Sequence, residues 1–164
     1  MTPSIDPFTE NVCEGYEVTY RWVTRDNCGN ELEISRSFNV LPDSEGPAFD
    51  SLPKPISDRD CGDPLPVIET LTVTDDCSNV VVTPNIDPYI EDNCNGYFIT
   101  YRWSAFDGCG NLNEVTQTFF TRPDTIKPTF LNLPNAIADV NCGDNLPTPE
   151  AISATHKCSE VTIL

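Results

Sequence analysis

The chain has 164 residues, with 26 acidic and 9 basic residues and a formal net charge of −17. This charge excludes nucleic acid and anionic lipid as expected partners, because both would be repelled. The chain contains no run of about 18 apolar residues, so we predict no direct membrane insertion. The apolar stretches are rich in Val, Ile, Thr, Tyr and Phe and lack helical periodicity, which predicts an all-β protein.

The cysteines reveal an internal repeat. They stand at positions 13, 28, 61, 77, 94, 109, 142 and 158, so the spacing of the first four is repeated without change by the last four. Residues 1–81 align with residues 82–162 without a gap, and roughly 45% of the aligned positions are identical. We therefore predict a tandem array with an 81-residue period.

Two matching proline-bounded segments, 42–47 and 123–128, suggest where one module ends and the next begins. Cutting the chain there predicts the C-terminal half of a repeat at 1–42, a complete repeat at 43–123 and the N-terminal half of the next at 124–164. No export signal follows Met1, and a disulfide-bearing chain without one is expected to be a fragment of something longer.

Alternating apolar residues predict the strands in chain order. In the first segment, a long strand contains Tyr16, Val18, Tyr20 and Trp22 on its inner face, and another contains Ile34 and Phe38. In the complete repeat we expect strands at about 47–52, 55–60, 67–74, 79–84, 96–106 and 112–121. Short strands at this spacing predict an antiparallel β-sandwich. Such a small core would depend on disulfides for part of its stability.

The eight cysteines favour disulfides over zinc, because no C-x-x-C pair is present and His156 is the only histidine. The long strand separates Cys94 from Cys109 by about 30 Å, too far for a bond between them. A meander of strands instead predicts the pairs Cys61–Cys94 and Cys77–Cys109. The remaining four are expected to pair with neighbouring repeats, beyond this sequence or in another chain: Cys13, Cys28, Cys142 and Cys158.

Several acidic residues recur with the same period, and four of them are candidate calcium ligands: Asp43, Asp58, Asp63 and Asp107. The alternative is that each aspartate caps a turn through its side chain. No other cofactor is required. The sequence contains no repeated catalytic set, so we predict no enzyme. His156 aligns with Asp75 and is expected to be a surface residue.

The motifs resemble those of a known class of repeats: Cys-Gly-Asp-x-Leu-Pro, Asp-x-Cys-Ser, Cys-x-Gly-Tyr-x-Ile-Thr-Tyr-Arg-Trp, Asp-x-Cys-Gly-Asn and Pro-Asp-x-x-x-Pro-x-Phe. They are similar to hyalin-type (HYR) immunoglobulin-like modules and to repeats of very large Bacteroidota surface proteins, including gliding-motility adhesins. The resemblance implies immunoglobulin-like sandwiches, secretion to the cell surface, and a role in adhesion or filament formation. It also implies a glycosylation site at Thr125, for which a plain turn is the alternative.

Two functions follow as expectations. The first is a semi-rigid stalk or filament whose partners are neighbouring repeats, because no flexible Gly/Ser linker separates the modules. The alternative is a module that binds surface glycans, proteins or other cells through exposed aromatic residues, with Phe98, Phe106 and Phe120 as candidates. If the chain exists as short subunits, residues 124–164 of one copy would complete residues 1–42 of another, because open strand edges recruit other strands.

Overall fold

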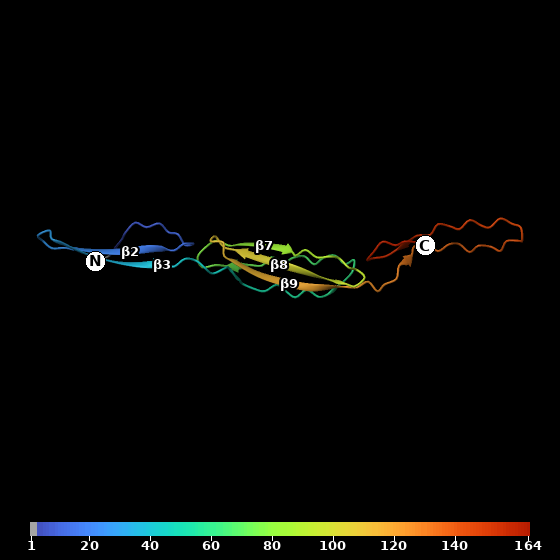
Figure 1. Ribbon diagram of the computed structural model, residues 1–164, viewed down its shortest axis with the longest axis horizontal. Coiled ribbons are helices and arrows are strands. Elements are labelled where there is room, and N and C mark those ends of the chain that lie inside the picture. The colour runs from blue at the N-terminus through green and yellow to red at the C-terminus, as the bar shows by residue number, and fades with distance from the viewer. Residues whose placement is uncertain (1–2) are drawn as a thin grey trace. The chain divides into compact units, whose positions relative to one another are not determined.

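A computed structural model describes residues 3–164, and every regular element in this part of the chain is a β-strand (Figure 1). The all-β prediction is confirmed. No helix in the described residues could cross a membrane. The strands are β1 (Ser4–Ile5), β2 (Tyr16–Arg25), β3 (Glu31–Val40), β4 (Ala48–Phe49), β5 (Arg59–Asp60), β6 (Val73–Thr74), β7 (Val81–Ile86), β8 (Tyr97–Phe106), β9 (Leu112–Arg122), β10 (Thr129–Phe130) and β11 (Ala154–Thr155).

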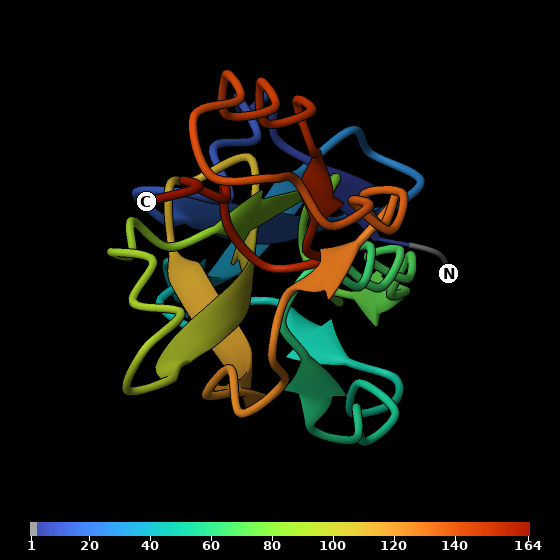
Figure 2. The same ribbon diagram turned by 90° about the vertical axis from the view of Figure 1, so that its right-hand side faces the viewer.

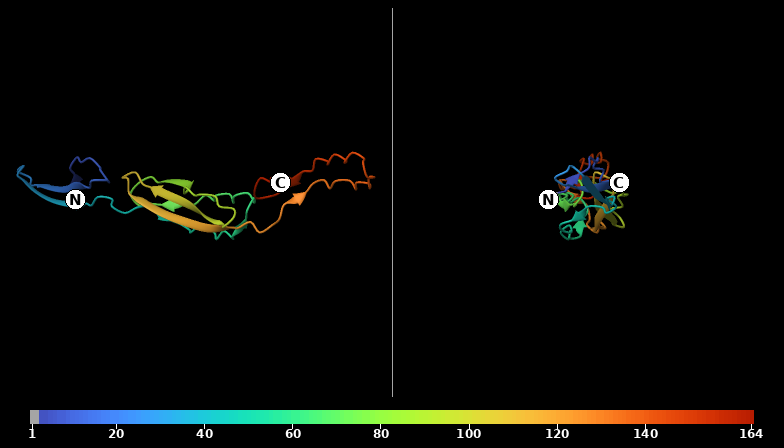
Figure 3. Two further views of the ribbon diagram at one scale, coloured as in Figure 1. Left: turned by 45° about the vertical axis from the view of Figure 1, so that its right-hand side comes forward. Right: turned by 90° about the vertical axis from the view of Figure 1, so that its left-hand side faces the viewer.

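The first segment forms a long antiparallel hairpin, seen at the blue end of the chain in Figure 3. Strands β2 and β3 pair from Tyr16↔Val40 to Arg25↔Glu31, and β1 adds a short third strand beside β2. The turn closes on the backbone bond from Asp26 N to Asn30 O, at 2.9 Å. Gly29 in this turn has a φ of 89°, a backbone conformation that residues with a side chain rarely adopt.

The central sheet has the order β5-β9-β8-β7, and Figure 2 shows β8 and β9 side by side. The inner face of β8 forms the core: Ile99, Tyr101, Trp103 and Ala105 are each no more than 1% exposed. Alternate residues of a strand point to opposite faces, so the period-2 pattern determined which side chains are buried. The sheet is mixed, because β5 pairs with β9 in parallel.

Three of the expected strands are much shorter than predicted. Segments 47–52, 55–60 and 67–74 contain only the two-residue strands β4, β5 and β6, of which β4 pairs with β6. Pro47 and Pro55 lie within the first two segments, where proline cannot donate a hydrogen bond to a ladder. The strand expected at 79–84 is present as β7, and those at 96–106 and 112–121 as β8 and β9.

Some strands begin at positions that are 81 residues apart in the sequence. Strands β2 and β8 begin at equivalent positions, Tyr16 and Tyr97, and β3 and β9 also begin at equivalent positions. The pairs of β10 with β11, Thr129↔Thr155 and Phe130↔Ala154, repeat the register of β4 with β6. The match is incomplete, because β5 at Arg59–Asp60 has no counterpart strand at residues 140–141.

The described chain divides into two compact units, each discontinuous in sequence. Unit 1 contains residues 1–54, 68–85 and 101–116, and unit 2 contains 55–67, 86–100 and 117–164. Unit 1 therefore joins the first segment to one part of the central repeat. Unit 2 joins the last segment to the other part.

Candidate functional site: two disulfide-linked joints

A disulfide in unit 1 joins Cys13 to Cys109, with the two Cα atoms 5.1 Å apart. We call its surroundings the first joint. Cys109 lies in the turn between β8 and β9, where Asp107 Oδ1 accepts hydrogen bonds from the backbone N–H groups of Cys109 and Asn111, both at 2.8 Å. This carboxylate therefore fixes the turn that presents the sulfur to Cys13.

The proline-bounded segment 42–47 contacts the same turn. Asn111 Nδ2 donates to Asp43 O at 3.3 Å, and Asn113 Nδ2 donates to Pro47 O at 3.0 Å. A Cβ on Gly46 would lie 2.9 Å from Leu112 O, so only glycine fits there. These contacts hold both ends of segment 42–47 against the turn and the start of β9, so the segment does not act as a flexible linker.

Cys77 also lies at the first joint, because Gly108 N donates to the neighbouring Ser78 Oγ at 3.0 Å. Asp75 Oδ1 accepts from the backbone N–H groups of Cys77 and Ser78, both at 2.9 Å. Partial burial raises the pKa of the Cys77 thiol above its usual range, and nearby carboxylates, Asp43 first among them, add to the shift.

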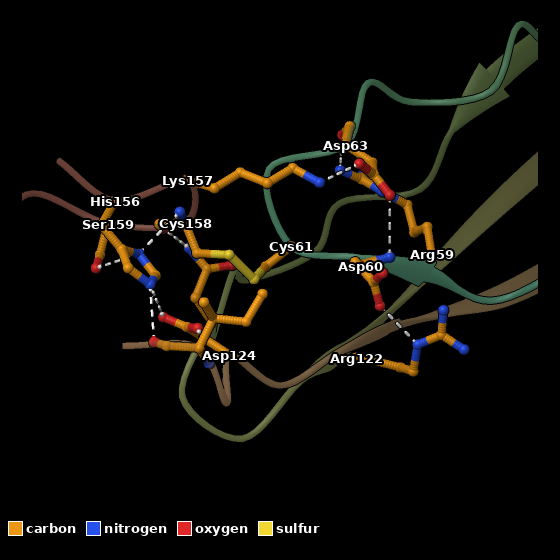
Figure 4. The surroundings of a disulfide bond; sticks show 12 residues. Arg59, Asp60, Cys61, Asp63, Arg122, Asp124, His156, Lys157, Cys158 and Ser159 are labelled. Carbon is orange, nitrogen blue, oxygen red and sulfur yellow. Dashed lines mark hydrogen bonds and ion pairs between the residues drawn. A yellow bond between two sulfur atoms is a disulfide. The ribbon is translucent and has the colours of Figure 1, made fainter. Parts of the chain in front are cut away.

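The second joint surrounds the disulfide Cys61–Cys158 in unit 2, whose Cα atoms are 5.3 Å apart (Figure 4). Lys157 forms an ion pair with Asp63, and its hydrogen bond holds the pKa of that carboxyl below its usual value. Asn93 Nδ2 donates to Cys158 O at 2.8 Å, which places the adjacent Cys94 at this joint. A Cβ on Gly62 would lie 2.5 Å from Lys157 O.

His156 is not the surface residue that the sequence suggested, because its side chain is only 3% exposed. Nε2 lies 2.9 Å from the carbonyl oxygen of Ile126, and Nδ1 accepts from the backbone N–H of Cys158 at 3.1 Å (Figure 4). A ring with its proton on Nε2 makes both bonds. His156 thus caps the Cys158 turn as Asp75 caps the Cys77 turn.

The predicted pairs Cys61–Cys94 and Cys77–Cys109 are wrong. Residues next to the predicted partners do make contacts: Gly108 N donates to Ser78 Oγ, and Asn93 Nδ2 donates to Cys158 O. The sulfur partners nevertheless come from the flanking segments, Cys13 for Cys109 and Cys158 for Cys61. Cys13 and Cys158 therefore pair within this chain rather than beyond it. The bonded cysteines are 96 and 97 residues apart, and no pattern in the sequence indicates these pairs.

Four cysteines are free and exposed in the described chain: Cys28, Cys77, Cys94 and Cys142. Their equivalents in the other repeat are Cys109, Cys158, Cys13 and Cys61, in that order. Each free cysteine is therefore the sequence equivalent of a cysteine that is bonded.

Of the four candidate calcium ligands, the structure brings two together. Asp43 and Asp107 lie at the first joint with oxygens within 4.8 Å of one another, and Asp43 Oδ2 is buried without a hydrogen-bond partner. Asp58 and Asp63 lie in unit 2 and belong to neither of the two clusters of potential metal ligands in the described residues, both of which include a disulfide-bonded cysteine. Asp58 Oδ1 accepts from Phe120 N at 3.2 Å, and Asp63 Oδ2 from Asp60 N at 3.3 Å.

The residues considered for modification or ligand binding are at least partly accessible. Thr125 is exposed, in the joint segment that precedes β10. Phe98 and Phe106 are 66% and 44% exposed on the outer face of β8. The Phe98 ring contacts the half-buried Phe120, with centroids 4.9 Å apart.

The sequence matches no family model, and no curated protein matches it in sequence.

Proposed function

We propose that this chain is a repeat segment of an extracellular adhesin or surface filament, built of immunoglobulin-like modules with an 81-residue period. The observation that carries the proposal is the sequence separation of the bonded cysteines, 96 and 97. Both separations exceed one period, so each disulfide connects two successive repeats. Cross-links between repeats resist extension, which suits a semi-rigid stalk for attachment or motility.

The disulfides also support a location outside the cell or on its surface, because such bonds persist in oxidising compartments. The resemblance of the motifs to HYR-like repeats of Bacteroidota gliding-motility adhesins points to the same place. The boundaries at residues 42 and 123, the sandwich architecture and glycosylation of Thr125 belong to this proposal. So does the absence of enzymatic activity.

Electron microscopy of a protein containing several consecutive repeats tests the proposal. We expect thin, stiff rods whose length increases in equal steps with the number of repeats. The matched control is the same protein after reduction of its disulfides, for which we expect more bending. Rods that collapse into globules under oxidising conditions would contradict a stalk function.

Binding of glycans or proteins is the second candidate function, supported by the exposed Phe98 and its contact with Phe120 on the outer face of the sheet. Aromatic faces pack on the apolar faces of sugars. Their equivalents in the preceding repeat are Glu17 and Asn39, so the pair is not a repeated feature. A glycan array probed with the chain and with Phe98→Ser tests this function: binding that depends on Phe98 supports it, and no binding leaves the stalk alone.

Calcium is the one cofactor that the proposal includes, with Asp43 and Asp107 as its ligands at the first joint. An ion there would neutralise two neighbouring carboxylates and occupy the unpartnered oxygen of Asp43. Any ligand that binds only the folded state raises the melting temperature. Equal melting temperatures in EDTA and in millimolar calcium would exclude this ion.

A further inference from the structure

The same strand face is covered in one repeat and open in the other. Tyr101 and Trp103 of β8 are buried, and Trp103 Nε1 donates to the carbonyl oxygen of Glu69 at 2.9 Å. Their equivalents in β2, Tyr20 and Trp22, are only partly buried. The cover over β8 comes from the N-terminal half of its own repeat, and the sequence equivalent of that half is residues 124–164.

The last segment, conversely, exposes apolar side chains that are half-buried at the equivalent positions of the central segment. Phe130 and Ile137 are 53% and 63% exposed, whereas their equivalents Phe49 and Ile56 are half-buried. Gly143 has a positive φ like Gly62, yet nothing lies within 4 Å of a Cβ built there, whereas Lys157 occupies that place beside Gly62. The two ends of the chain therefore carry complementary halves of the same structure.

The free cysteines fit this complementarity. Cys94 is the equivalent of Cys13, and Cys28 is the equivalent of its partner Cys109. Likewise, Cys142 is the equivalent of Cys61, and Cys77 of its partner Cys158. Repeating the two observed bonds across one more junction would use all four free thiols.

We propose that a second copy of this chain docks head to tail on the first, and that the disulfides Cys94–Cys28 and Cys142–Cys77 join the two copies. Residues 124–164 of the first copy cover the β2 face of the second. Cys94 and Cys142 belong to the first copy, and Cys28 and Cys77 to the second. The inference rests on the proposed stacking of repeats and adds the docking partner and the pairing.

Each bond forms by oxidation of two thiols, which lose two protons and two electrons. A disulfide oxidant such as oxidised glutathione takes up the electrons and becomes two molecules of the reduced thiol. Because the pKa of the Cys77 thiol is raised, the exchange is best followed at a mildly alkaline pH of about 8.5.

The second joint within the chain and the proposed junction between two copies differ in the charge of one residue, because Lys157 is equivalent to Asp76. At the internal joint Lys157 pairs with Asp63, whereas their equivalents at the junction are Asp76 of the second copy and Asp144 of the first. Two carboxylates would meet there, so the Cys142–Cys77 bond should form faster at high salt, which screens their repulsion. Asp76→Lys restores the ion pair and should raise the yield of this bond.

Complementary variants test the proposal. Cys28→Ser/Cys77→Ser keeps only the thiols of the C-terminal side, and Cys94→Ser/Cys142→Ser keeps only those of the N-terminal side. In a glutathione redox buffer, we expect each variant alone to remain monomeric and a 1:1 mixture to form a covalent dimer. Peptide mapping should identify Cys94–Cys28 and Cys142–Cys77 in that dimer, with Cys13–Cys109 and Cys61–Cys158 intact as the folding control.

Covalent dimers from either variant alone would overturn the proposal, because they show random oxidation. So would a mixture that stays monomeric while its internal disulfides are intact. Trp22 gives a second readout: on dimer formation its emission should shift to shorter wavelength, and Trp22→Phe should abolish the shift. The rods expected from several consecutive repeats test the proposed function separately, since they can form whether or not separate copies dock.

Discussion

Trp103 lies at the centre of the core and donates its indole N–H to the carbonyl oxygen of Glu69 at 2.9 Å. The bond connects the middle of β8 to the loop that covers it, 34 residues earlier in the chain. Buried indole groups generally need such a partner. This bond therefore ties the proline-rich half of the repeat to the sheet.

Replacing Trp103 should be far more damaging than replacing its equivalent Trp22. We expect Trp103→Ala to lower the free energy of unfolding by about 3 to 5 kcal/mol, through the cavity that it leaves. Trp22→Ala should have a smaller effect, because Trp22 is only partly buried. Urea denaturation followed by circular dichroism measures both. Equal losses in the two variants would contradict the assigned burial.

The disulfides should contribute strongly to stability, because each closes a long loop in the chain. Cys13→Ala/Cys109→Ala is expected to lower the free energy of unfolding by about 2 to 5 kcal/mol. Cys28→Ala/Cys77→Ala changes two free, exposed thiols and is the matched control, with little effect expected. Denaturant midpoints of the two double variants provide the comparison, and a control as unstable as the test variant would refute this account.

Substitutions at Gly62 and Gly143 can distinguish the effect of the close contact with Lys157 from the effect of backbone strain. Both have positive φ, 71° and 100°, but only Gly62 faces the Lys157 backbone. Gly62→Ala should push residues 156–159 away and make Cys61–Cys158 easier to reduce. Gly143→Ala carries comparable strain without a clash and should leave that bond unchanged.

The rate at which dithiothreitol reduces Cys61–Cys158 measures this difference, with Cys13–Cys109 as an internal reference. An increase for Gly62→Ala alone is the expected result. Equal increases in both variants would show that strain, not the close approach of Lys157, determines the outcome.

Acid should weaken the second joint. The pKa of Asp63 in the folded chain is below its ordinary value of 3.8, chiefly because Lys157 donates a hydrogen bond to its carboxylate. Stabilisation by a group with a lowered pKa is present above the unfolded-state pKa and is lost as the pH falls through the folded-state pKa. The melting temperature should therefore drop below about pH 4.

Asp63→Asn should reduce that drop, because it removes the titrating group, and Lys157→Met should reduce it by removing the partner. Thermal melts of the three proteins between pH 3 and 7 give the comparison. An identical pH profile for all three would show that other carboxylates govern the acid response.

The sequence alone determined the strands whose alternating apolar residues show which face is buried. Alternation from Tyr97 to Phe106 predicted the buried face of β8, and the corresponding pattern from Tyr16 to Trp22 predicted β2, which the structure extends to Arg25. The prolines at 53, 55, 64 and 66 predicted that this region would remain at edges or in loops, although not that its strands would shrink to two residues each.

Only the tertiary structure decided which sulfur atoms meet. The sequence predicted the pairs Cys77–Cys109 and Cys61–Cys94, whereas the bonded pairs are Cys13–Cys109 and Cys61–Cys158. A disulfide, however, requires Cα atoms within about 7 Å, and that depends on how segments about 96 residues apart in the sequence pack together. Local periodicity carries no information about docking between repeats. For the same reason the burial of His156, which depends on contacts with the segment around Ile126, became evident only in three dimensions.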